Sequence, residues 1–291
     1  MDDRQDPSAG GDFLIEKIKR TQAFSMDSHH THDSYEIYYL LDGERHYFIK
    51  DRTYRVRRGD LVLIPAGELH QTLQAADGAH ERILINFRAG FIRPFQDEEL
   101  NYDAVFRRCP VLALNAREQM TVEGLLQRML DEDRLRPQGW RLQLRLSLAE
   151  LLLFLCRKCG SAPAEPAEHP NPTFRKVSEI ARYIGDHYGE PLSLESLSSL
   201  FHISPYYLSR TFKKVTGFGL VEYMHWVRVK EAQRLLRTTS LPITEVSMRS
   251  GFDSITHFGR VFKELCGMPP RTYRSRHADP SPRRSGNTPP R

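Results

Sequence analysis

The sequence predicts a two-domain α+β protein, with a small N-terminal β domain that ends in a helical hairpin and a C-terminal all-α domain. Three observations indicate this fold class. Short β-branched and aromatic runs recur between turn signals over residues 13–87. From Arg117 onward, apolar residues recur at helical spacing instead. Residues 160–173 contain four prolines and no large apolar side chain, which is typical of a linker between domains.

The N-terminal strands are expected to form a small cupin-like barrel or sandwich, which we place at residues 1–116. Tyr35–Leu41 is rich in aromatic and β-branched residues, and Asp42-Gly43 is a strong hairpin signal before a return strand. Strands this short and this regularly spaced are typical of barrels and sandwiches. The remaining strands are expected at residues 45–50, 53–56, 60–64, 71–73 and 82–87.

Two long helices are expected next, over residues 117–159. Met120, Leu125 and Met129 belong to the apolar stripe of the first helix, and Pro137-Gln138-Gly139 ends it. The second helix is expected at 140–158, which makes an antiparallel hairpin. The linker at 160–173, an all-α domain at 174–276 and a disordered tail at 277–291 complete the predicted organisation.

Composition and charge narrow the class of protein. The chain has 291 residues, 40% of them hydrophobic and 27% charged, which is ordinary for a globular protein. Its most apolar run, 148–156, is interrupted by Glu150 and is far shorter than the roughly 20 residues of a membrane-spanning helix. The acidic N-terminus resembles no signal peptide, and four cysteines do not make a disulfide scaffold. We therefore expect a cytoplasmic protein with no membrane partner.

The charge is unevenly distributed. Residues 174–276 carry 16 Lys and Arg against 9 Asp and Glu, whereas residues 1–173 carry 23 against 27. A basic C-terminal part suggests that this part binds nucleic acid.

The C-terminal part contains an internal repeat. Leu208–Gly217 matches Phe258–Gly267 at an offset of 50. Each copy has a short helix, a tight turn with a serine suited to cap a helix, and a second helix that stops at glycine. This is the layout of a helix-turn-helix. Residues 220–237 should form one helix of about 27 Å, comparable with the roughly 34 Å between successive major-groove faces of DNA. The matched positions are Arg210 with Arg260, Phe212 with Phe262, Lys213 with Lys263 and Gly217 with Gly267.

The segment Ile243–Arg274 resembles the signature of AraC/XylS-family transcription regulators, and the resemblance covers about residues 174–276. It implies sequence-specific binding of double-stranded promoter DNA, a small-molecule effector, RNA polymerase as a partner and activation rather than repression. It also implies a homodimer formed through the helical hairpin. Gly259 departs from the expected polar residue. The residues implied to face DNA are Tyr206, Ser209 and Arg210 on the first recognition helix and Ile255, Thr256, His257 and Arg260 on the second, with Lys213 and Lys263 on phosphates.

A group of histidines in the N-terminal part has the spacing of a metal site. His30, His32 and Glu36 share even parity, so a single strand would point all three to one side. Together with His70 later in the sequence, this spacing of histidines and glutamate resembles the two motifs of the cupin barrel. In that fold, the corresponding histidines and glutamate bind one divalent metal. Zn, Ni, Mn or Fe would suit these ligand types. Alternatively, the histidines are polar pocket residues that hydrogen-bond a ligand or the end of a strand.

Four further residues, Tyr38, Arg45, Tyr47 and Arg82, are expected to line the same interior, where they would suit a sugar or a carboxylated metabolite. We expect a regulator without catalytic residues. The alternative is a cupin-type metalloenzyme, an isomerase or dioxygenase, fused to a DNA-binding domain, although the sequence offers no separate acid/base pair. The Cys156-x-x-Cys159 pair lies at the end of an apolar helix and is interpreted as ordinary helix, and Cys109 as a small hydrophobic residue.

Overall fold

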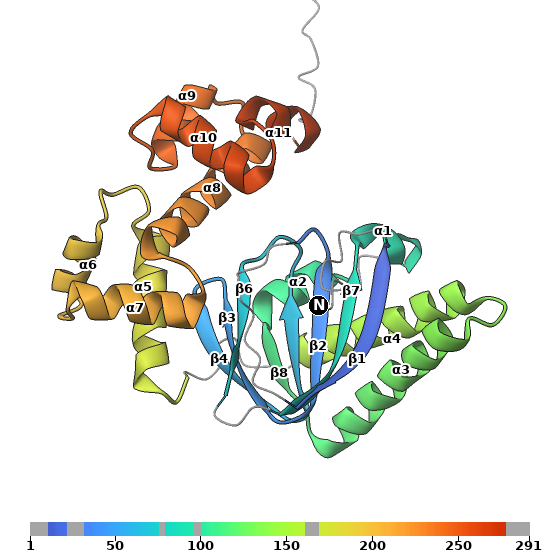
Figure 1. Ribbon diagram of the computed structural model, residues 1–291. Helices are drawn as coiled ribbons and strands as arrows, with labels where there is room; N and C mark the ends of the chain where they lie inside the picture. The colour runs from blue at the N-terminus through green and yellow to red at the C-terminus, as the bar shows by residue number, and fades with distance from the viewer. Residues whose placement is uncertain (1–10, 22–31, 76–78, 96–99, 161–168, 278–291) are drawn as a thin grey trace, which may run out of the picture. The chain divides into compact units, whose positions relative to one another are not determined.

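The computed structural model describes residues 11–21, 32–75, 79–95, 100–160 and 169–277 (Figure 1). The chain divides into two compact units, residues 1–178 with 215–217, and residues 179–214 with 218–291. Both ends of the predicted linker are helical, because one helix continues to Gly160 and the next begins at Pro172. The predicted tail lies outside the described residues apart from His277, which ends the last helix.

The N-terminal unit contains two antiparallel sheets (Figure 1), with the strand orders β1-β7-β2-β5-β8 and β4-β3-β6. The six strands predicted between residues 35 and 87 are confirmed to within one or two residues. The described strands pair only within these two sheets, so the expected barrel is corrected to two unclosed sheets. The strands are β1 (Phe13–Arg20), β2 (Tyr35–Asp42), β3 (Glu44–Ile49), β4 (Arg52–Arg57), β5 (Asp60–Ile64), β6 (His70–Gln74), β7 (His80–Phe87) and β8 (Val111–Ala113).

The turn at Asp42-Gly43 is a corner between the sheets and not the predicted hairpin. β2 pairs with β5 and β7, whereas β3 pairs with β4 and β6. The register of β2 on β7 shifts between Leu40 and Asp42, immediately before the corner. Gly43 has a φ of +91°, and a Cβ there would lie 2.6 Å from the carbonyl oxygen of Ala79. A residue without a side chain is therefore needed for the chain to leave one sheet for the other.

The larger sheet has a core on each face, because successive side chains of a strand point to opposite sides. Tyr38 and Leu40 of β2 join the core between the two sheets. Ile37 and Tyr39 join the core under the helices. The covering helices are α1 (Ala89–Ile92), the 3-10 turn η2 (Arg93–Phe95), α2 (Tyr102–Arg108), α3 (Ala116–Leu135) and α4 (Trp140–Gly160).

The predicted helical hairpin is confirmed in α3 and α4. A capping box begins α3: the Asn115 side chain accepts from the backbone N–H of Glu118, whose carboxylate accepts from the Asn115 N–H. Sequence reasoning missed β8 and the short helices α1 and α2. It also treated the cysteines as unpaired, whereas Cys109 and Cys159 form a disulfide with Cα atoms 6.4 Å apart.

The C-terminal part contains two helix-turn-helix units, α6/α7 and α9/α10, as the repeat predicted. The predicted N-caps are confirmed, since Ser204 and Ser254 accept hydrogen bonds from the backbone N–H groups of Tyr207 and His257. Among the described residues, no helix combines the length and apolar character needed to cross a membrane. The helices are α5 (Pro172–Asp186), α6 (Leu194–Leu200), α7 (Pro205–Thr216), α8 (Leu220–Thr238), α9 (Ile243–Arg249), α10 (Ile255–Cys266) and α11 (Pro270–His277).

One glycine inside α10 and one immediately after it are expected to affect stability in opposite directions when replaced by alanine. Gly259 lies inside the helix, and a Cβ there would meet nothing within 4 Å, whereas Gly267 follows the helix with a φ of +69°. We expect Gly259→Ala to raise the free energy of unfolding by about 0.5–1 kcal/mol, because alanine restricts the unfolded chain and favours helix. Gly267→Ala is expected to lower it by about 1 kcal/mol, because alanine disfavours positive φ. Urea unfolding followed by Trp226 fluorescence in a Trp140→Phe background measures both, and a stabilised Gly267→Ala would contradict the assignment.

Candidate functional site

The first candidate recognition helix, α7, has one buried and one exposed face. Leu208 and Phe212 are buried against the rest of the domain. Tyr206 is 73% exposed, and Ser209, Arg210 and Lys213 are also exposed. The guanidinium of Arg210 donates to the Tyr206 hydroxyl at 3.4 Å, one helical turn away. All four residues singled out on α7 are therefore available to a partner.

The second candidate recognition helix, α10, repeats this arrangement with two differences. Phe258 and Phe262 are buried, whereas Ile255, Thr256, Arg260 and Lys263 are exposed. His257 is half-buried, with its ring centroid 5.1 Å from that of His225 and 5.7 Å from that of Phe252. The Arg260 guanidinium lies 3.8 Å from the Glu264 carboxylate, in an exposed pair that contributes little to stability.

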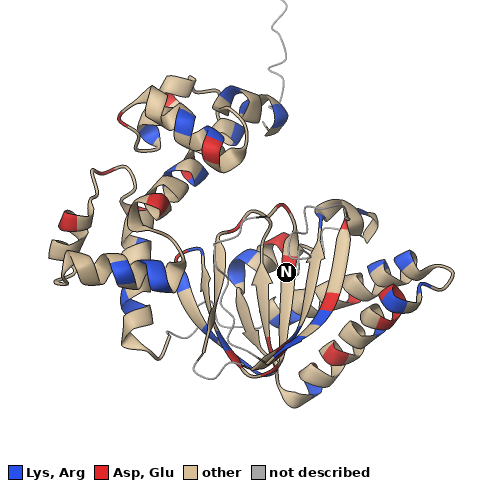
Figure 2. Ribbon diagram, in the orientation of Figure 1, with Lys and Arg blue, Asp and Glu red and all other residues tan. Residues whose placement is uncertain are grey.

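Lys and Arg residues lie on both recognition helices and on α11 (Figure 2). Exposed arginines can donate two hydrogen bonds to a guanine edge, and lysines suit phosphates. On α7 and α10 the exposed arginine is followed three residues later by an exposed lysine. The two helices therefore present the same pair of cationic groups at equivalent positions.

Three of the four predicted metal ligands lie together in the N-terminal unit. His32, Glu36 and His70 each offer a ligand atom, and these atoms all lie within 4.8 Å of one another. The Nε2 atoms of His32 and His70 lie 3.3 and 3.9 Å from the same oxygen of Glu36. Two atoms bound to one tetrahedral zinc at about 2.0–2.1 Å would lie roughly 3.3 Å apart. The donor set is therefore close to the spacing that a shared ion requires.

The hydrogen bonds of the two histidines favour the same ring nitrogen as a ligand. The Nδ1 atom of His32 lies 2.8 Å from the carbonyl oxygen of Ser34, and that of His70 lies 3.1 Å from the carbonyl oxygen of Glu68. An Nδ1–H that donates to a carbonyl leaves Nε2 of a neutral ring with a lone pair. When a cation replaces the proton that His32 Nε2 shares with Glu36, the Nε2 lone pairs of both histidines face it, and all three groups attract it.

The charges in the cluster reinforce one another. Burial acts to raise the pKa of Glu36, but the hydrogen bond from His32 and the nearby His70 outweigh it, and the pKa lies below its usual value. Burial acts to lower the pKa of His32, but the hydrogen bond to Glu36 and its charge outweigh that effect and raise it. The cluster therefore favours an ionised carboxylate, which is the form that binds metals, whereas a metal would have to displace the proton that the raised pKa of His32 favours.

His32 and His30 differ in how the structure bears on their predicted roles. β2 begins at Tyr35, so His32 precedes the strand, and the condition that one strand carries both His32 and Glu36 is not met. His32 instead reaches Glu36 from the preceding segment, where its ring also contacts the hydroxyl of Ser34 at 3.0 Å. His30 lies outside the described residues, so its part in the site stays a prediction.

The predicted effector-binding residues lie in the interior between the sheets. The rings of Tyr38 and Tyr47 meet edge to face at 5.3 Å, and the Arg82 guanidinium lies 5.5 Å from the Tyr38 ring centroid. Arg45 is only 1% exposed. Burial lowers the pKa of Arg45, Tyr38 and Tyr47 act to raise it, and Arg82 and Arg20 act to lower it to a smaller extent. The sequence analysis did not single out Glu16 of β1, which forms an ion pair with Arg82 at 3.3 Å. The signal for this pair is that β1 is the strand next to β7, which carries Arg82.

Both parts of the chain match known protein families. Residues 14–150 match the AraC-like ligand binding domain, and residues 197–276 match a helix-turn-helix domain. The chain belongs to the AraC family. It is therefore a DNA-binding transcription regulator with a ligand-binding domain, as the resemblance of residues 174–276 implied.

Individual relatives of this AraC-family regulator span most of its length. An uncharacterised HTH-type transcriptional regulator of Bacillus subtilis, YfiF, is 27% identical over 257 residues, which cover 86% of this chain and 79% of the relative. The arabinose operon regulatory protein of Escherichia coli is 26% identical and covers 77% of this chain and 74% of its own. The apo structure of a ToxT variant from Vibrio cholerae is 13% identical, with a TM-score of 0.39, over 92% of this chain and 99% of its own.

Proposed function

We propose that this AraC-family regulator is an effector-responsive activator that recognises its promoter through α7 and α10. The observation that carries the DNA-recognition part is the exposed arginine and lysine repeated at equivalent positions, Arg210 with Lys213 and Arg260 with Lys263. Each arginine reads base edges and each lysine holds a phosphate. Two reading helices in one chain give an asymmetric site for each protomer.

The effector is a small sugar-like or carboxylated metabolite held between the two sheets. Arg45 is buried near two further arginines, Arg82 and Arg20. A bound carboxylate would offset the repulsion among these cations. Tyr38 and Tyr47 supply aromatic faces beside them.

A divalent ion at His32, Glu36 and His70 would extend this site, with Zn, Ni, Mn or Fe as the suitable metals. Such an ion would supply a positive centre for an oxygen of the effector. The interior would then hold the effector through both the ion and the arginines.

The active form is proposed to be a homodimer that works with RNA polymerase. Large apolar side chains are exposed on the helical hairpin, which supports a subunit interface there. Effector binding would change how the sensor domain positions or releases the DNA-binding domain through the segment that joins them. The exposed side chains are Met120 and Leu135 on α3 and Leu142 and Leu146 on α4.

DNA recognition is tested on a duplex selected from a random pool by the wild-type protein. Arg210→Ala and Arg260→Ala are each expected to weaken binding by about 1–3 kcal/mol and to relax specificity at the contacted base. Lys213→Ala should weaken binding to all DNA sequences alike, and it should reduce the magnitude of the slope of log K against log salt concentration by about 1. Fluorescence anisotropy over a salt series measures both effects.

A matched control is Arg128→Ala on α3, where the arginine pairs with Glu150 at 3.6 Å on an exposed surface. Its DNA affinity should equal that of the wild type. Unchanged affinity in both Arg210→Ala and Arg260→Ala would contradict recognition through α7 and α10. A Lys213→Ala variant that weakened only one sequence would contradict its assignment to a phosphate.

A further inference from the structure

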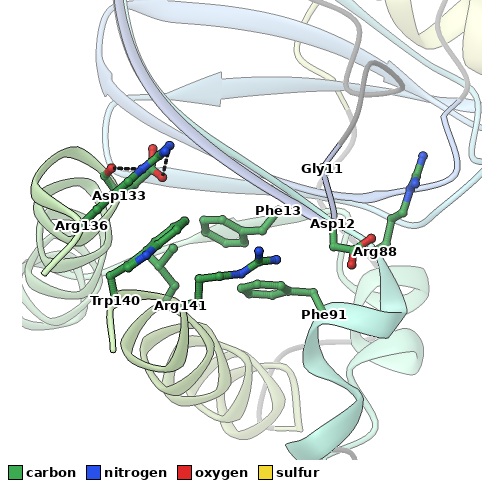
Figure 3. Close-up of a pocket in the computed structure, with 10 residues that line it drawn as sticks. Gly11, Asp12, Phe13, Arg88, Phe91, Asp133, Arg136, Trp140 and Arg141 are labelled. Carbon is green, nitrogen blue, oxygen red and sulfur yellow. Dashed lines mark hydrogen bonds and ion pairs between the residues drawn. The ribbon is translucent and has the colours of Figure 1, made fainter. Parts of the chain in front are cut away.

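A second pocket of the N-terminal unit lies at the turn between α3 and α4, with a volume of about 530 Å³ (Figure 3). This volume is within the range of small-molecule sites. Strand β1, helix α1 and the α3–α4 turn each contribute to its wall. The residues that bear on its chemistry are the aromatic Phe13, Phe91 and Trp140, the basic Arg88, Arg136 and Arg141, and the acidic Asp12 and Asp133.

This pocket is separate from the proposed effector site. Phe91 belongs to the core between the larger sheet and its helices, and Phe13 packs against that core. Tyr38 and Tyr47 belong to the core on the opposite face of the same sheet. A ligand in the pocket at the α3–α4 turn would therefore touch none of the residues proposed to bind the effector.

Aromatic rings form the apolar part of the pocket. The rings of Phe13 and Phe91 are stacked with centroids 4.8 Å apart. Phe91 is 2% exposed, whereas Phe13 and Trp140 are half-buried, so they keep surface for a ligand. Stacked and edge-on aromatic surfaces suit a flat apolar molecule.

Arginines supply the polar part. Arg136 and Arg141 lie over the Trp140 ring, at 4.8 and 5.8 Å from its centroid. Arg136 is held by the carboxylate and carbonyl of Asp133, and Arg88 pairs with Asp33 at 3.3 Å. In the part of the chain that the structure describes, Arg141 has no carboxylate partner, and Figure 3 shows its side chain directed toward Phe13 and Phe91.

Two further features favour an anion here. Arg145 does not line the pocket, but it lies one turn after Arg141 and adds a positive charge near it, with its guanidinium 5.2 Å from the Phe91 ring centroid. Its buried Nε atom has no hydrogen-bond partner among the described residues. The helix α4 also begins at Trp140 without an acidic residue in its first turn, so the positive end of its dipole is not neutralised there.

We propose that this pocket binds a small organic carboxylate with a flat apolar body, with the carboxylate on Arg141 and the body against Phe13, Phe91 and Trp140. A guanidinium recognises a carboxylate through paired, charge-assisted hydrogen bonds, which are stronger than neutral ones. The bound molecule would join the α3–α4 turn to β1 and α1. It would thereby hold the tip of the helical hairpin against the sheet.

The test uses full-length protein, 2-naphthoate as the probe, and 2-naphthylmethanol as its neutral counterpart. Isothermal titration calorimetry should detect naphthoate binding to the wild type, weakened tenfold or more by Arg141→Gln. Naphthylmethanol should bind more weakly than naphthoate and should not respond to Arg141→Gln. Arg134→Gln is the matched control, because Arg134 is an exposed arginine of the same hairpin that pairs with Asp131 and does not line the pocket.

A second readout locates the probe. The chain has two tryptophans, Trp140 in the pocket and Trp226 in α8. The ¹H–¹⁵N signal of the Trp140 indole, assigned with Trp140→Phe, should move on titration with naphthoate, and that of Trp226 should not. No binding up to millimolar naphthoate, equal binding by both probes, or full affinity in Arg141→Gln would overturn the proposal. Loss of binding in Arg82→Gln alone would place the ligand between the sheets instead.

Discussion

Wild-type protein is expected to bind about one divalent ion per chain, and replacement of His70 by alanine is expected to abolish that binding. His70 is 1% exposed, and its Nε2 atom lies 3.9 Å from the Glu36 carboxylate oxygen. The variant leaves His32 and Glu36 as the two remaining ligands of the described cluster. Two ligands hold a metal far less tightly than three or four, because each lost ligand must be replaced by water.

Metal analysis of untagged protein, after incubation with Zn, Ni, Mn or Fe and desalting, measures the effect. Glu36→Gln should lose the ion as well, because the amide carries no charge. Metal at a hundred times its dissociation constant should raise the free energy of unfolding by about 2.7 kcal/mol in the wild type and not in His70→Ala. The control is His277→Ala, since His277 is an exposed histidine of the other unit.

The outcome decides between the two interpretations of the histidines. A wild-type protein that retains none of the four metals would contradict the metal site, and His32 and His70 would then be polar residues of the pocket wall. Equal metal loss in His277→Ala would show that the bound ion lies elsewhere. His30→Ala tests whether the fourth predicted ligand, outside the described residues, takes part.

Replacement of Phe262 by alanine is expected to lower the free energy of unfolding of the C-terminal unit by about 3–5 kcal/mol. Phe262 is 0% exposed, with its ring 5.5 Å from both Phe258 and Tyr273. It joins α10 to α11 within the core of the second helix-turn-helix unit. Removing the ring leaves a cavity that these neighbours can fill only in part.

Lys263→Ala, at the next position of the same helix, is the control. Lys263 is exposed, so its removal should change stability by less than about 0.5 kcal/mol. It should still weaken DNA binding, as expected of a phosphate contact. Urea unfolding followed by Trp226 fluorescence in a Trp140→Phe background separates the two variants. Equal stability of Phe262→Ala and the parent protein would contradict the core assignment.

The local structure of this protein was predictable from the sequence because its signals are local. A serine cap, a glycine stop and the spacing of Leu208 and Phe212 predicted α7, and the offset of 50 residues predicted its counterpart α10. These features act over one or two helical turns and depend little on the rest of the chain. The same reasoning placed the strands between residues 35 and 87.

The arrangement of the strands was not predictable in the same way. Asp42-Gly43 is a strong hairpin signal, but β2 and β3 belong to different sheets. The residues of a turn indicate only that the chain reverses direction. They do not indicate which strands pair, and β2 pairs with β5 on one edge and β7 on the other. Likewise, no spacing rule joins Cys109 to Cys159, which are 50 residues apart and meet where α2 ends beside α4.

In the two candidate ligand sites, too, the sequence predicts some features and the folded structure is needed for others. The residue types His32, Glu36 and His70 were predicted from spacing, but their approach depends on a segment before β2 and on the start of β6. The pocket at the α3–α4 turn was not predicted, because Phe13, Phe91 and Trp140 share no motif.

Local signals in the sequence predict the two-domain order, the helices and strands, the repeated basic recognition helices and the residue types of the candidate metal site. The folded structure is needed to see that the strands form two sheets, which face of each sheet is covered, and which aromatic rings and arginines meet at Trp140. The difference comes from the range over which the interactions act. Caps, turns and periodicity act between neighbours in the chain, whereas burial joins any surfaces that fit together, whatever their separation.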